Sequence, residues 1–261
     1  MVPKYSTYAG GLKRAARAAL ANVSAPDRGD RLKRSIRHWT FMYESSQIPL
    51  LFPIDIWPGI ADEPATVALD MRYSFELPFG ERALLSGLVK MRKPQMIFEF
   101  GTFTGSTTLL LADASPVDCI VHTIDLPDSA FPPNGFDNWF TSALVGTYLC
   151  LADRKRSDKV IAHRADLDTF DFTEFEAQAD LVFVDADHSY ESVLRDSQTA
   201  FRIVKPAGTI IWDDYHPSHW GSVRALNEIA QDNPLVRVGG TRLVACQLNH
   251  GETRRDTIPT T

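Results

Sequence analysis

The chain has 261 residues, of which 44% are hydrophobic, and its formal net charge is −6. This length suits one α/β domain with an extension, and the apolar content is enough for a full-sized core. No apolar run approaches the roughly 18 to 20 residues of a membrane-spanning helix, and no secretory signal is recognisable. The three cysteines, Cys119, Cys150 and Cys246, form neither a zinc-binding spacing nor a disulfide framework, so we expect a cytoplasmic protein.

The first 44 residues carry nine Lys or Arg against three acids, which leaves a net charge of −12 on the rest of the chain. Apolar residues at helical spacing predict helices over residues 12–23 and 31–43. A basic arm can bind nucleic acid, but this one lacks the aromatic interleaving that is typical of single-strand binders. We therefore expect a homo-oligomer in which the arm packs on the acidic body, and no nucleic-acid partner.

Five prolines punctuate residues 48–78 and exclude a long helix there. The same segment carries apolar residues such as Leu51, Phe52 and Trp57. It is either a lid over a substrate or a strap packed on the core, and the sequence leaves both readings open. Helical spacing returns over residues 79–91. We expect residues 1–77 to form a helical extension with this lid or strap, residues 78–250 the main domain and residues 251–261 a loose tail.

The segment MIFEFGTFTGSTT is the most informative part of the chain. An apolar strand carries Glu99 near its end, a turn contains Gly101 and Gly105, and hydroxyl residues from Ser106 onward open a helix. Backbone N–H groups at such a helix start face a nucleotide-like ligand. A dinucleotide turn needs glycine at its first, third and sixth positions, but Phe103 occupies the third. The spacing therefore argues against a dinucleotide.

Four further strands are predicted, each with an acid at or just beyond its end. They cover residues 119–125, 159–166, 180–185 and 208–214, with helices predicted over residues 141–153, 190–204 and 220–230. Two short runs at residues 235–238 and 243–248 predict a closing antiparallel hairpin at the sheet edge. The pattern indicates a Rossmann-like, doubly wound, mostly parallel α/β sheet. In the loop after the second strand, Phe136 and Trp139 are candidate contacts to substrate or adenine.

The acids at the strand ends are candidate ligand-binding residues because the carboxyl ends of parallel strands share one crevice. Asp125 lies about one βα unit after Glu99 and can accept hydrogen bonds from two ribose hydroxyls. Asp185, Asp213 and Asp214 end neighbouring strands. Three like charges in one crevice favour a hard divalent cation such as Mg²⁺ or Mn²⁺, which would help a substrate hydroxyl to lose its proton.

A histidine provides a second route to proton removal. His188 lies three residues after Asp185 and is a candidate general base, because imidazole titrates near neutral pH. The alternative is a residue at the helix start that is bonded only to backbone. His216 and His219, just past the fifth strand, are alternative bases or substrate contacts, and Asp187 is assigned to the cap of the following helix.

The glycine turn and the segment FVDADHSYESVLRDSQTAFRIVKPAGTIIWDDY resemble class I S-adenosylmethionine (SAM) methyltransferases, in particular small-molecule and sugar O-methyltransferases of bacterial biosynthetic clusters. The similarity covers residues from about 78 to 248. It implies a metal ion on Asp185, Asp213 and Asp214, and an adenine contact from Asp166. The residues that the resemblance implies for SAM binding are Glu99, Gly101, Phe103, Gly105, Ser106, Asp125, Asp166 and Asp185. Ala207 departs from the family pattern, which has a glycine at this place.

We therefore expect SAM-dependent methyl transfer to a hydroxyl of a small-molecule acceptor, assisted by Mg²⁺ and carried out by His188 and Asp185. Two alternatives stay open: a metal-independent N-methyltransferase, and a non-catalytic SAM-fold binding or scaffold subunit. A nucleic-acid methyltransferase is disfavoured because the body is acidic. The Asn-Pro-Pro-Tyr-type tetrad of many base-modifying enzymes is also absent after the fourth strand.

Overall fold

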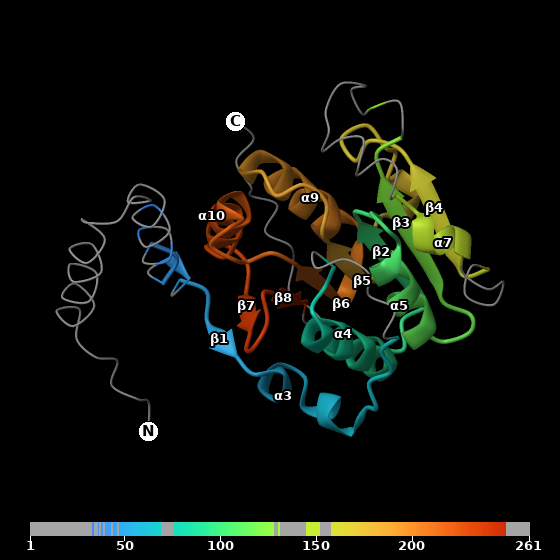
Figure 1. The fold of residues 1–261 in the computed structure, drawn as a ribbon, viewed down its shortest axis with the longest axis horizontal. Coiled ribbons are helices and arrows are strands. Elements are labelled where there is room, and N and C mark those ends of the chain that lie inside the picture. Colours follow the sequence, from blue (N-terminus) through green and yellow to red (C-terminus); the bar gives the residue numbers. More distant parts are fainter. Residues whose placement is uncertain are drawn as a thin grey trace, which may run out of the picture.

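The computed structural model describes residues 33, 36, 38, 40–42, 44, 45, 47–68, 76–127, 130, 145–151 and 158–248. They form an eight-stranded sheet with helices on both faces (Figure 1). The described positions between residues 33 and 44 are helical. The predicted helix over residues 12–23, the loop residues Phe136 and Trp139, and the predicted tail at 251–261 lie outside the described residues.

The central elements alternate between strand and helix, as the sequence predicts. The strands are β1 (Leu50–Leu51), β2 (Met96–Phe100), β3 (Ile120–Asp125), β4 (Val160–Arg164), β5 (Ala179–Val184), β6 (Val204–Trp212), β7 (Leu235–Val238) and β8 (Val244–Gln247). The helices are α3 (Pro53–Ile56), α4 (Phe79–Arg92), α5 (Ser106–Ala114), α7 (Thr147–Leu151), α9 (Tyr190–Ile203) and α10 (Trp220–Ile229), with 3₁₀ helices η1 (Pro58–Asp62) and η3 (Thr173–Phe175). None of the described helices is long and apolar enough to cross a membrane.

The strand order is β1-β7-β8-β6-β5-β2-β3-β4. Every pairing is parallel except those of β8, which runs antiparallel to both β6 and β7. This confirms the prediction of a mostly parallel sheet with a C-terminal hairpin. The hairpin does not form the outer edge, however, because β1 pairs with β7 and places Leu50 opposite Arg237.

Both faces of the sheet are covered, so its central strands are continuous apolar runs. Neighbouring residues of β2 point to opposite faces. Ile97 packs in a cluster with α4 and α5, which contribute residues such as Leu88 and Leu111. Phe98 packs in the other cluster with α9 and α10, which contribute Val193 and Leu226.

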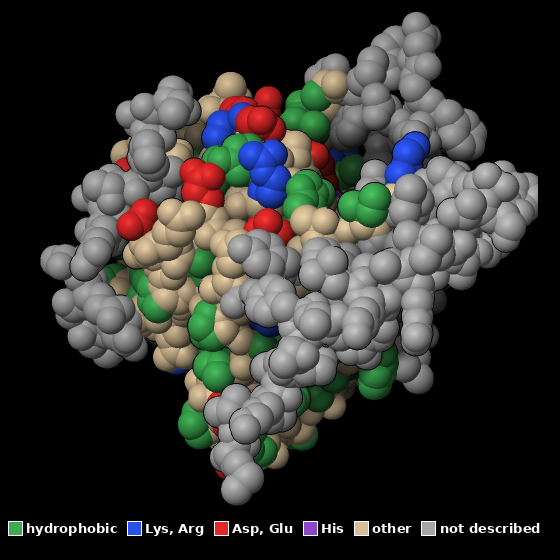
Figure 2. All heavy atoms as spheres, turned by 90° about the vertical axis from the view of Figure 1, so that its left-hand side faces the viewer, with side chains coloured by type: hydrophobic (Ala, Val, Ile, Leu, Met, Phe, Trp, Pro, Cys, Tyr) green, Lys and Arg blue, Asp and Glu red, His purple; other side chains and the backbone are tan. Residues whose placement is uncertain are grey.

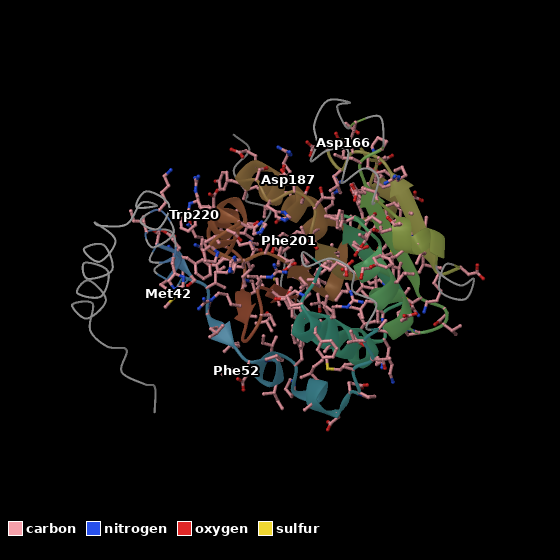
Figure 3. The ribbon with its side chains drawn as sticks, viewed as in Figure 1. Met42, Phe52, Asp166, Asp187, Phe201 and Trp220 are labelled. Atoms are coloured by element: carbon pink, nitrogen blue, oxygen red, sulfur yellow. The ribbon has the colours of Figure 1, made fainter. Side chains whose placement is uncertain are left out.

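The proline-rich segment before α4 runs along the sheet edge and then over α4. Trp57 is buried, and the hydroxyl of Ser86 accepts a hydrogen bond from the backbone N–H of Thr66 and donates one to its carbonyl. The ammonium group of Lys90 donates to the carbonyl of Pro64 at 2.7 Å. Figure 3 shows Phe52 beside β1, well away from Asp187 at the carboxyl end of β5. The described part of this segment therefore packs on the core.

Candidate functional site

The turn after β2 is shaped by three residues in the left-handed region, Gly101, Phe103 and Gly105, with φ of 94°, 43° and 83°. A Cβ atom on Gly101 would lie 2.0 Å from the carbonyl oxygen of Asp185. Only glycine therefore lets the ends of β2 and β5 approach so closely. Gly105 precedes α5, and a Cβ there would lie 2.6 Å from the side chain of Leu149 in α7.

Asp125, at the end of β3, holds the glycine turn in place. Its Oδ2 accepts hydrogen bonds from the backbone N–H groups of Thr102 at 3.0 Å and Phe103 at 2.8 Å, and its Oδ1 accepts one from Leu126 at 2.8 Å. An ionised carboxylate has about four acceptor positions, so capacity remains for one further donor such as a ribose hydroxyl. The sequence predicted the ligand role of this residue but not its bonds to the turn.

Glu99 lies behind the turn in the protein interior. Its Oε2 accepts hydrogen bonds from the hydroxyls of Thr108 at 2.5 Å and Thr123 at 2.7 Å. Burial raises the pKa of Glu99 to about 8, which favours the neutral form of the side chain. The Ser106 hydroxyl accepts from the guanidinium of Arg82 at 2.6 Å. Glu99 and Ser106 therefore support the glycine turn from its interior side.

A cavity of about 690 Å³ opens at the carboxyl ends of the strands. Figure 3 shows Asp166 and Asp187, which both line it, at this same end of the sheet. The described lining residues all lie between residues 101 and 214, so none comes from the strap. Among the predicted site residues, those that line the cavity are Gly101, Phe103, Asp125, Asp166, Asp185, His188, Asp213 and Asp214. Glu99, Gly105 and Ser106 are not among its lining residues.

Three carboxylates, Asp185, Asp213 and Asp214, converge on one side of this cavity, with oxygens within 4.8 Å of one another. Asp213 and Asp214 follow β6, which ends at Trp212, and Asp214 has a left-handed φ of 61°. This bend allows two adjacent residues to turn toward the same place. Burial, and then the neighbouring charge of Asp214, raise the pKa of Asp213 to about 7. Burial and the charges of the two neighbours raise the pKa of Asp185 well above its ordinary value.

Arg242 supplies positive charge to this cluster, and the sequence analysis missed it. Its Nη2 lies 3.2 Å from Asp213 Oδ2 and 3.3 Å from Glu81 Oε2, and its Nη1 lies 3.0 Å from Asp214 Oδ1. The residue stands in the turn between β7 and β8. Its place at the site depends on the antiparallel register of β6 and β8, which pairs Trp212 with Val244 and so brings the turn between β7 and β8 close to Asp213 and Asp214.

His188 pairs with Asp214 at the site. Its Nε2 lies 2.8 Å from Asp214 Oδ2, and the ring of His219 packs on it with a centroid separation of 4.3 Å. Burial alone would lower the pKa of His188, but the hydrogen bond and charge of Asp214 raise it above the ordinary value. Burial would raise the pKa of Asp214, but the bond to His188 and the charge of Arg242 lower it. His216 is exposed and bonds instead to the Ser218 hydroxyl.

The sheet has β8 inserted between β6 and β7, a glycine turn after β2 and acids at the strand ends. This arrangement agrees with the fold that the resemblance to class I, SAM-dependent methyltransferases implies. The family comparison agrees with this assignment. Residues 98–215 match the family model described as a methyltransferase domain.

Among curated proteins, the chain is similar to an uncharacterized protein of Acanthamoeba polyphaga mimivirus, with 34% identity over 55 residues. That match spans 20% of this chain and only 25% of the relative. Among solved structures, the chain is similar to the O-methyltransferase TomG from Streptomyces achromogenes in complex with SAM, with 17% identity, a TM-score of 0.47 and coverage of 80% of this chain and 95% of that chain. An O-methyltransferase from Bacillus cereus in complex with SAH gives 18% identity, a TM-score of 0.46 and coverage of 67% and 84%.

Proposed function

We propose that this protein transfers the methyl group of SAM to a hydroxyl of a small molecule, with a divalent cation held by the acid cluster. One observation carries the proposal. The glycine turn lines the same cavity as His188 and the acid cluster of Asp185, Asp213 and Asp214. SAM brings its own electrophile, so the protein has to hold the nucleophile in line and help to remove its proton. The volume of about 690 Å³ falls within the range of small-molecule sites.

The end of the cavity near Gly101 has the features needed to bind SAM. Asp125 keeps acceptor capacity for a ribose hydroxyl, and Asp166 lies on the exposed rim, where it can accept from an adenine amino group. Phe103 lines the same part of the cavity with an apolar ring. Phe103 occupies the third position of the turn, where a pyrophosphate-binding turn needs glycine, so SAM suits the turn better than NAD.

The pair of His188 and Asp214 supports the proton transfer. If Nε2 of His188 donates to Asp214 Oδ2 at 2.8 Å, the other ring nitrogen, Nδ1, is the acceptor. An imidazole oriented in this way by a carboxylate can take a proton from a hydroxyl during methyl transfer. The carboxylate also stabilises the imidazolium that results.

The acid cluster fits a hard divalent cation. It supplies only oxygen donors, its oxygens lie within 4.8 Å of one another, and Oδ1 of Asp213 is buried with no hydrogen-bond partner. Asp185, Asp213 and Asp214 would hold the ion, which would lower the pKa of a bound hydroxyl. We infer Mg²⁺ or Mn²⁺ as the ion.

A specific observation favours a second candidate, metal-independent methyl transfer to an amine. Arg242 already contacts Asp213 and Asp214, so part of the negative charge is balanced without an ion. In that case the pair of His188 and Asp214 would be the whole proton-transfer apparatus. Activity that persists in excess chelator would favour this candidate.

The test combines a binding and a turnover measurement. Calorimetry should show binding of SAM or SAH and none of NAD. Formation of SAH from SAM in the presence of a panel of hydroxylated small molecules should stop with EDTA and return with Mg²⁺ or Mn²⁺. Asp185→Asn should abolish the metal response, whereas Asp232→Asn, an exposed acid in the turn after α10, is the matched control. Binding of NAD without SAM would overturn the proposal.

A further inference from the structure

Two histidines and one carboxylate meet at the rim of the cavity from three separate loops. His188 precedes α9, Asp214 follows β6, and His219 precedes α10. Nε2 of His188 lies 2.8 Å from Asp214 Oδ2, and Nδ1 of His219 lies 3.6 Å from the same oxygen. All three donor atoms lie within 4.8 Å of one another.

The fold brings these loops together through a close backbone contact. A Cβ atom on Gly221, in the first turn of α10, would lie 2.2 Å from the carbonyl oxygen of His188 and 2.6 Å from the backbone nitrogen of Tyr190. Glycine therefore permits the start of α10 to rest on the start of α9. This packing of the two helix starts places the backbones of His188 and His219 near each other.

The donor set is suited to a transition metal rather than to Mg²⁺. Two imidazoles and one carboxylate are a recurrent ligand set for divalent iron, and imidazole also suits zinc, nickel and copper. With bond lengths of roughly 2.0–2.2 Å, two ligand atoms of a tetrahedral zinc ion lie about 3.3–3.5 Å apart. The distances of 2.8 and 3.6 Å need only small side-chain movements to reach this value.

The other oxygen of the Asp214 carboxylate, Oδ1, also has a partner. Nη1 of Arg242 lies 3.0 Å from Oδ1 of Asp214, which leaves Oδ2 turned toward the two histidines. Such outer partners orient metal ligands in known sites and raise their affinity. The side chains of His188 and His219 are 34% and 29% exposed, so an ion has access from solvent.

We propose that His188, Asp214 and His219 form a binding site for a transition-metal ion of the Zn²⁺ or Co²⁺ type. We call it the His–Asp–His site. It differs from the acid cluster in two of its three ligands and does not depend on methyl transfer. An ion bound there requires the His188 tautomer that carries its proton on Nδ1, so that the Nε2 lone pair binds the ion instead of Nε2–H donating to Asp214. It therefore withdraws His188 from proton transfer.

The test uses Co²⁺, which reports on its ligands by visible absorption, added to the full chain without a polyhistidine tag. The wild-type protein should take up Co²⁺ saturably, with the absorption of a nitrogen- and oxygen-bound ion. His219→Ala should weaken this binding by at least about tenfold, because even outer-shell changes cost that much. Excess Zn²⁺ should abolish the signal, and a similar excess of Mg²⁺ should not.

His216→Ala is the matched control, because His216 lies three residues from His219 but bonds to Ser218. It should leave Co²⁺ affinity unchanged. Asp185→Asn removes a ligand of the acid cluster only, so loss of the Mg²⁺ response and loss of Co²⁺ binding can be told apart. His188→Gln provides a second ligand variant, and thermal unfolding without metal checks that each variant is folded. Equal Co²⁺ affinity in the wild type, His219→Ala and His188→Gln would overturn the proposal.

Discussion

At the scale of single residues, Asp214 contacts both the arginine and the two histidines of the site. It adopts a left-handed backbone conformation, contacts Arg242 through Oδ1, and contacts His188 and His219 through Oδ2. Backbone strain of this kind costs about 1–3 kcal/mol and persists only where surrounding contacts impose it. Here those contacts are a cation on one side and imidazoles on the other. The strain therefore coincides with the chemistry of the site.

Asp214→Asn should lower kcat by about 10²–10⁴-fold, the usual range for loss of acid–base assistance, and leave SAH affinity nearly unchanged. The amide can still accept a hydrogen bond, but it carries no charge to stabilise a protonated His188. Turnover and calorimetry with SAH measure the two quantities separately. Asp232→Asn serves as control. An equal loss of SAH affinity would mean that Asp214 acts on the cofactor instead.

Ala207 is a second residue with a left-handed backbone, at φ 64°, and stands where the resembled family has glycine. The left-handed conformation costs an alanine roughly 1–2 kcal/mol in the folded state. Glycine avoids this cost, but its greater conformational entropy stabilises the unfolded state by about 0.4–1 kcal/mol. Ala207→Gly should therefore stabilise the protein by up to about 1 kcal/mol, seen as a higher urea midpoint with an unchanged m-value. Ala162→Gly, in β4 and without positive φ, should be destabilising instead.

At the scale of elements, the sequence predicted the longer strands, β2 to β8, and missed the two-residue strand β1. The strands β2, β3, β5 and β6 are largely apolar and have an acid near or just beyond their last residue, and this signal needs no knowledge of partners. β1 has two residues, Leu50 and Leu51, next to a proline, so neither alternation nor length distinguishes it from a loop. Its assignment depends entirely on pairing with β7.

The candidate site likewise contains residues that the sequence could place together and residues that it could not. The acids Asp185, Asp213 and Asp214 could be placed together because the ends of neighbouring parallel strands meet. Arg242 could not, because its position depends on the register of β8 against β6, and register is not readable from one strand alone. The contact of His219 with His188 likewise depends on Gly221, whose role becomes visible only when α9 and α10 are packed.

A pair of histidines links β3 and β4 and should make the protein sensitive to acid. Nδ1 of His122 lies 3.0 Å from Nε2 of His163, and both rings stack against Phe98. Burial, and then the neighbouring His163, lower the pKa of His122 to about 4. The folded state thus favours neutral His122. Its contribution to stability is complete above pH 6.5 and is lost as the pH falls toward 4.

Protonation of His122 should accordingly lower the free energy of unfolding by up to about 3 kcal/mol as the pH falls from 6.5 to 4. His122→Phe keeps an aromatic ring beside Phe98 but removes the titrating group, so the fall should become shallower. Urea titrations at several pH values measure it. His216→Phe, at an exposed position, is the control. The same pH slope in wild type and His122→Phe would show that other groups cause the acid sensitivity.

At the scale of the whole molecule, charge and apolar surface are unevenly distributed. The net charge of the first 44 residues is opposite to that of the rest. Among the described residues, Ile36 and Met42 in the helical segment are 57% and 61% exposed, and Phe52 and Ile54 near β1 are also exposed. Figure 3 shows Met42 and Phe52 on the β1 side of the molecule, and Figure 2 shows apolar side chains on that side. Apolar surface of this kind often marks a protein–protein contact.

We therefore predict that residues 1–32 and this surface contribute to self-association. The deletion should end at residue 32, because residues after it contact the body. The rings of Phe41 and Tyr215 have a centroid separation of 5.7 Å, and the carbonyl of Glu44 accepts a hydrogen bond from the Asn227 side chain at 3.3 Å. Removing these contacts would disturb the body itself. Deletion of residues 1–32 should lower the mass measured by light scattering and leave the thermal unfolding of the monomer intact.

The alternative role of the basic segment is nucleic-acid binding, and the same deletion distinguishes it. Retention on immobilised RNA that falls steeply between 50 and 200 mM salt would indicate phosphate contacts, whose number sets the slope. If the intact chain shows such retention and the deletion leaves its mass unchanged, the segment binds nucleic acid and the self-association prediction is wrong. We expect the opposite, because the acidic body repels a polyanion and offers a basic segment of a second copy a complementary surface.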